Sequence, residues 1–95
     1  MRKASPVMRE ELCIGHLIFC PACRCGHLFY NVQAGQSARW TFNGDLDNPT
    51  FNPSMLIKES VNHPRCHSFV RNGKIEFLSN CTHSMAGQTV DLPEI

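Results

Sequence analysis

The chain has no long hydrophobic run and no excess of charge of either sign. Its longest apolar stretch, Ile14–Phe19, is interrupted by Gly15 and His16 and is far too short to span a membrane. Residues 1–12 contain no uninterrupted apolar segment of the kind found in signal peptides. The formal net charge is only +1, which is not the basic excess typical of nucleic-acid-binding domains. We therefore expect a protein of the reducing cytosol, with no membrane association.

The sequence also lacks the recognisable motifs of several enzyme classes. There is no His-x-Glu of a nucleobase deaminase and no His-Glu-x-x-His of a metalloprotease. A glycine-rich phosphate loop and a serine nucleophile elbow are also absent. With no complete catalytic set identified, the sequence favours a non-enzymatic role and predicts no catalytic residue.

What the chain does have is cysteine. Six cysteines in 95 residues permit either a disulfide framework or a metal site. The disulfide alternative needs a secretory context, whereas cysteine pairs with nearby histidines in a cytosolic protein are typical of zinc ligands. A domain this small is marginally stable without a cross-link. We therefore expect at least one Zn²⁺, with a second ion left open.

The first half of the predicted site is a Cys-x-x-Cys turn. Cys20 and Cys23 have the spacing of a zinc knuckle, in which a tight turn directs both sulfurs to one centre. A redox dithiol is the rival interpretation, but it requires a helix after the motif, and Gly26 and the strand-like residues that follow argue against one. His27 is either a further ligand or an ordinary polar residue at the start of a strand.

The second half depends on a predicted hairpin. Cys66–Arg71 and Lys74–Ser79 flank Asn72-Gly73, the pair preferred in type I′ turns. The two-residue loop brings Cys66 close to Cys81, with His83 two residues further on. Alternation along the strand places His67 on the face opposite Cys66, so both cannot easily bind one ion. The candidate metal ligands are Cys20, Cys23, His27, Cys66, His67, Cys81 and His83, and the sequence does not decide which four bind.

The remaining segments predict a mainly β fold with little helix. Residues 1–11 are polar and are expected to be poorly ordered, and residues 12–95 to form one compact, zinc-stabilised antiparallel domain. A small α+β domain is the alternative. The expected strands are Leu12–Phe19, His27–Gln33, Ala38–Phe42, Ser54–Lys58, Cys66–Arg71, Lys74–Ser79 and Gln88–Leu92.

Four segments together resemble a known family. They are Phe19–His27 (FCPACRCGH), Trp40–Ser54 (WTFNGDLDNPTFNPS), Cys66–His83 (CHSFVRNGKIEFLSNCTH) and Met85–Pro93 (MAGQTVDLP). The chain resembles short tailed-phage and prophage proteins of no assigned function, some labelled ammonia monooxygenase although that enzyme is a large membrane assembly. The resemblance implies a phage origin and a zinc-binding fold whose pattern falls on all seven candidate ligands. Relatives tend to have Asp where this chain has Asn80.

These observations lead to one expected function and two alternatives. We expect a phage-encoded module that binds a host protein in the bacterial cytoplasm and inhibits a defence or regulatory system. The first alternative is a metal-dependent hydrolase with an open zinc site among His27, His67 and His83. The second is a zinc-ribbon-like module that binds nucleic acid through scattered Arg and Lys residues. The target and the oligomeric state are not determined by the sequence.

Overall fold

The computed structural model describes residues 1–95, and nearly all of its regular structure is strand. The strands are β1 (Ala4–Arg9), β2 (Leu12–Cys20), β3 (Cys25–Tyr30), β4 (Thr41–Phe42), β5 (Phe51–Ile57), β6 (Cys66–Arg71), β7 (Lys74–Phe77) and β8 (Thr89–Asp91). The one helical element is a 3₁₀ turn, η1 (Val32–Ala34), and it is too short to cross a membrane. The prediction of a mainly β fold with little helix is confirmed.

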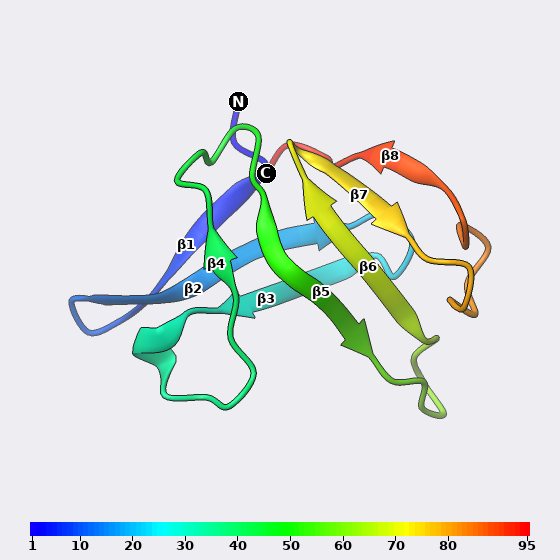
Figure 1. The fold of residues 1–95 in the computed structure, drawn as a ribbon, viewed down its shortest axis with the longest axis horizontal. Coiled ribbons are helices and arrows are strands. Elements are labelled where there is room, and N and C mark those ends of the chain that lie inside the picture. Colours follow the sequence, from blue (N-terminus) through cyan, green and yellow to red (C-terminus); the bar gives the residue numbers. More distant parts are fainter.

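The strands form two antiparallel sheets that pack face to face. One sheet has the order β1-β2-β3 and the other β4-β5-β6-β7-β8. In Figure 1 the smaller sheet lies behind the larger, with its strands crossing those of the larger sheet. The core lies between them and takes side chains from both, such as Ile18 and Phe29 from one sheet and Phe51, Val70 and Ile75 from the other.

The β6–β7 hairpin forms around the predicted Asn72-Gly73 turn. Asn72 and Gly73 both have positive φ, 50° and 76°, as a type I′ turn requires. Val70 lies opposite Ile75, and the inward-facing residues of the pair are buried. The turn type and the period-two alternation therefore determine which side chains of this hairpin reach the core.

The expectation that residues 1–11 are poorly ordered is wrong. Ala4–Arg9 form β1, which pairs with β2, and Ala4 is completely buried opposite Ile18. The backbone N–H groups of Lys3 and Ala4 also donate to the carbonyl oxygen of Leu46. The order of this segment comes from its hairpin with β2 and from the contact with Leu46, which its polar composition does not reveal.

Strand β5 departs from regular pairing at the segment that carries Ser54. Phe51 lies opposite Val70, but Met55 lies opposite Ser68. Three residues of β5, 52–54, therefore face the single residue Phe69 of β6. Such bulges redirect side chains away from the regular alternation and are common beside functional sites.

Candidate metal centre and the adjacent serine site

Four of the candidate ligands meet at the edge of the core where the two sheets come together. The ligand atoms of Cys20, Cys23, His27 and Cys66 all lie within 4.8 Å of one another. Cys20 ends β2, Cys23 lies in the turn that follows, His27 is in β3 and Cys66 begins β6. The backbone N–H of Cys23 donates to Cys20 Sγ at 3.4 Å, as expected of a knuckle turn.

The chemistry of this group suits a metal ion. His27 is only 3% exposed, and neither of its ring nitrogens has a hydrogen-bond partner. A buried imidazole without partners is costly, and coordination of an ion by one nitrogen removes part of that cost. All six cysteines are free thiols rather than disulfides. The residues therefore form a Cys/His group positioned to hold a metal ion.

The three thiols of this group already perturb one another strongly. A hydrogen bond from Cys66 holds the pKa of the Cys20 thiol well below its usual range. The same hydrogen bond, together with burial, raises the pKa of Cys66. Burial and the neighbouring Cys20 raise the pKa of Cys23 to about 12. Without an ion the negative charge therefore favours Cys20 over Cys23 and Cys66, whereas a bound divalent cation would deprotonate all of its thiol ligands.

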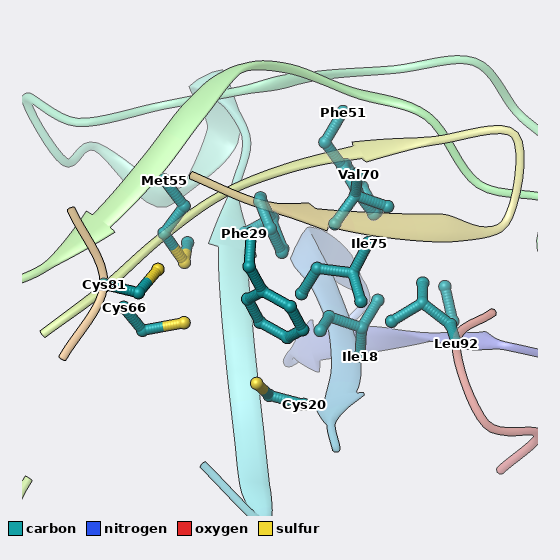
Figure 2. Packing of buried hydrophobic residues seen from close by; sticks show 12 residues of the cluster. Ile18, Cys20, Phe29, Phe51, Met55, Cys66, Val70, Ile75, Cys81 and Leu92 are labelled. Atoms are coloured by element: carbon teal, nitrogen blue, oxygen red, sulfur yellow. The ribbon is translucent and has the colours of Figure 1, made fainter. Parts of the chain in front are cut away.

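Two further groups adjoin the first. One consists of Cys66, Cys81 and His83, and the buried Nε2 atom of His83 has no partner. The approach of Cys81 to Cys66, which the hairpin geometry predicts, is confirmed and is visible at one end of the core (Figure 2).

The other group consists of Cys25, His27 and His63. Cys25 and His63 were not among the candidates. A bridge between Ser60 and His63 folds the loop back so that His63 Nε2 lies 3.9 Å from Cys25 Sγ. Nothing local in the sequence indicates this contact.

His67 is the one candidate that the structure leaves outside these groups. It lies on the opposite face of β6 from Cys66 and contacts two polar side chains there. Its Nε2 atom is 3.2 Å from Ser54 Oγ, and its Nδ1 atom is 3.3 Å from Asn80 Oδ1. An amide oxygen only accepts hydrogen bonds, so Nδ1 carries the proton and Nε2 accepts from the serine hydroxyl. This is the arrangement of a nucleophile, a base and a group that orients the base.

The candidate metal ligands adjoin this serine site directly. His67 follows Cys66 in the chain, and Asn80 precedes Cys81. The backbone N–H of His67 donates to Cys81 Sγ at 3.2 Å, and its carbonyl accepts from Leu78 N at 2.9 Å. An ion bound by Cys66 or Cys81 would therefore hold the segments that carry His67 and Asn80.

Ser54 and Asn80 were not predicted as functional residues. Ser54 does not occur in a Gly-x-Ser-x-Gly elbow, and the bulge that presents it depends on pairing with β6. One signal was available in the sequence. Alternation along the strand directs His67 away from the metal ligands, and an imidazole on that face can contact a nucleophile on the neighbouring strand.

The comparisons with known proteins identify one family. No curated protein and no solved structure is significantly similar to the chain. Residues 3–78 match the family model described as bacterial ubiquitination-like system serine protease, BubE. The match covers well over half of the 95 residues, and we conclude that the protein belongs to the BubE family.

Proposed function

We propose that this chain is a serine peptidase in which Ser54 is the nucleophile and His67 the general base. Asn80 acts as the positioning residue of His67. The hydrogen-bonded chain Ser54–His67–Asn80 carries the proposal, because it joins the three groups in the order that activates a serine. The description of the family as serine proteases supports the same reaction class.

The reaction follows from these contacts. Ser54 Oγ attacks the carbonyl carbon of the scissile peptide bond while His67 Nε2 takes the hydroxyl proton. The resulting imidazolium gives that proton to the leaving amine, and the acyl group remains as an ester on Ser54. Water, deprotonated by the same nitrogen, then hydrolyses the ester and regenerates the serine. Throughout, Asn80 Oδ1 accepts from His67 Nδ1 and keeps Nε2 directed at the serine.

We further propose that the metal is Zn²⁺ and that its role is structural. Three thiols and a buried imidazole match the closed tetrahedral sites that zinc prefers. When bound there, zinc supplies a rigid cross-link with no coordination position left for water. The alternative of an open zinc site among His27, His67 and His83 is less well supported, because His67 contacts Ser54 and Asn80 instead.

For the substrate, we propose a polypeptide of a bacterial ubiquitination-like system in the cytosol, following the family description. The expected role as a phage-encoded inhibitor of a host protein stays a prediction. That role follows by elimination when no catalytic set is identified, and the proposed serine site would be such a set.

Labelling with a fluorophosphonate probe tests the peptidase proposal. Such probes modify only serines made nucleophilic by a neighbouring base. We expect one adduct per chain, on Ser54, located by peptide mass spectrometry, together with hydrolysis of unstructured polypeptide substrates. Ser54→Ala should abolish both, and the matched change at an exposed serine, Ser60→Ala, should alter neither.

Two results would count against the proposal. One is a folded wild-type protein that remains unlabelled under conditions that label a known serine peptidase. The other is hydrolysis that persists in Ser54→Ala but disappears when a chelator removes the metal from the still folded protein. The second result would point to the metal-dependent hydrolase.

A further inference from the structure

A cavity of about 520 Å³ opens beside the β5 segment that precedes Ser54, between β4–β5 of the larger sheet and strands β2 and β3 of the smaller one. This volume is within the range of pockets that bind small ligands or side chains, roughly 300–1,000 Å³. Most of its wall is made by six residues: His16, Phe29, Trp40, Phe42, Phe51 and Pro53.

The wall is a set of aromatic rings held by mutual packing. Phe51 stacks between Phe29 and Phe42, with ring centroids 4.4 and 5.2 Å apart, and Trp40 meets Phe29 edge-on at 5.4 Å. His16 packs on Phe42 with centroids 4.0 Å apart. Because burial lowers the pKa of His16, its ring is neutral near pH 7 and brings no charge to the wall.

Several polar groups of the wall are already engaged in hydrogen bonds. Asn31 donates to the carbonyl of Cys13 and accepts from the N–H of Gln33. The indole N–H of Trp40 donates to the carbonyl oxygen of Ser54 at 3.2 Å. Arg39 lines the exposed rim. The interior therefore favours an apolar occupant, since a polar one finds few free partners there.

The cavity borders the β5 segment that leads to Ser54, although Ser54 and His67 do not themselves line it. Asn52 and Pro53, the two residues before Ser54, line it, and Trp40 both lines it and binds the backbone of Ser54. A side chain seated in the cavity therefore lies beside the two residues that precede the nucleophile in β5.

We propose that this cavity is a substrate subsite that receives one large apolar side chain, aromatic or branched aliphatic, close to the scissile bond. The inference rests on the proposed peptidase function and adds a specificity to it. Burial of such a side chain strengthens binding, so we expect peptides that carry one to bind at least tenfold more tightly than their alanine counterparts, an order-of-magnitude figure from apolar transfer.

The test uses Trp40, which is the chain's single tryptophan and lines the cavity. The probes are acetylated, amidated hexapeptides of alanine with Phe or Leu at each position in turn. Titration into Ser54→Ala protein while following tryptophan fluorescence measures binding without turnover. The same peptides incubated with wild-type protein and analysed by mass spectrometry show where cleavage occurs relative to the apolar residue.

Paired variants connect binding to the cavity. Thr41 lines it, and Thr89 is an exposed strand residue of β8 that does not. In the Ser54→Ala background, Thr41→Phe should remove the preference for Phe and Leu peptides, and Thr89→Phe should keep it.

The outcomes separate the two proposals. Probe labelling of Ser54 with equal binding and cleavage of all peptides overturns the subsite and leaves the peptidase intact. Tight binding of Phe or Leu peptides without labelling or cleavage overturns the peptidase and, with it, the assignment as a substrate subsite. Both the peptidase and the subsite are supported by a combination of three results. These are labelling of Ser54, cleavage at a constant distance from the apolar residue, and loss of the preference in Thr41→Phe.

Discussion

At the scale of single residues, the position of Asn80 sets the strength of the proposed base. Its amide oxygen accepts from His67 Nδ1, so it selects the productive tautomer. It is neutral, however, and a neutral acceptor stabilises the imidazolium that forms during the reaction less than a carboxylate does. Because Asn80 lacks that charge, this chain should be a slower peptidase than one with an aspartate at the same position.

We therefore predict that Asn80→Asp raises kcat for peptide hydrolysis by about tenfold or more, because a carboxylate stabilises the imidazolium directly. KM should change little, since Asn80 contacts His67 and not the substrate. Asn80→Ala should lower kcat while leaving the melting temperature near that of the wild type. Equal rates for Asn80→Asp and Asn80→Ala in folded protein would contradict a positioning role.

At the scale of elements, the β6–β7 hairpin contributes one residue to the candidate metal centre and one to the serine site. It places Cys66 in the core and His67 on the outer face. Its turn packs closely against the rest of the protein. The N–H of Gly73 donates to Pro49 O at 3.0 Å, and its carbonyl accepts from Leu92 N at 2.9 Å. A Cβ atom at Gly73 would lie 2.9 Å from Asn48 Oδ1 and 3.2 Å from Asn48 Cα.

Gly73→Ala should therefore destabilise the fold for two reasons, its φ of +76° and this contact with Asn48. We expect a loss of about 2–3 kcal/mol in the free energy of unfolding, measured by urea denaturation. Gly44 also has a positive φ, +87°, but a Cβ there meets nothing within 4 Å. Gly44→Ala should thus cost about 1 kcal/mol from strain alone. Equal losses would show that the contact with Asn48 has no effect.

At the scale of the whole molecule, the metal group links the two sheets. Cys20, Cys23 and His27 come from the β1-β2-β3 sheet and its turn, and Cys66 comes from the larger sheet. A bound ion thus cross-links elements that are far apart in the sequence. In a domain of this size, such a cross-link contributes a large share of the total stability.

Removal of the metal with a chelator should lower the melting temperature by more than about 10 °C, because about 2–3 kcal/mol corresponds to that shift in a small domain. Cys20→Ser should behave similarly, and Cys13→Ser, outside all three groups, should not. Circular dichroism gives the melting curve, and elemental analysis gives the metal content per chain.

The same samples test whether the metal takes part in the reaction. If its role is structural, probe labelling of Ser54 should fall in proportion to the folded fraction. Labelling lost before unfolding would contradict a purely structural role and show that the ion either positions the segments of His67 and Asn80 or takes part in the reaction.

Local features of the sequence were sufficient to predict much of the candidate metal centre. The Cys20–Cys23 spacing predicts the knuckle turn, the Asn72-Gly73 turn predicts the approach of Cys66 to Cys81, and strand alternation predicts the outward position of His67. Each of these features depends only on neighbours along the chain or across a two-residue loop. The mainly β fold followed from the absence of helical periodicity.

Only the tertiary structure decided the rest. The order of residues 4–9 depends on pairing with β2, and the approach of His63 to Cys25 depends on a folded-back loop. The serine site depends on a bulge in β5 that turns Ser54 towards a histidine of β6 and an asparagine of the turn beyond β7. The two hydrogen bonds of the serine site each join residues 13 positions apart, and no local pattern encodes distances of that kind.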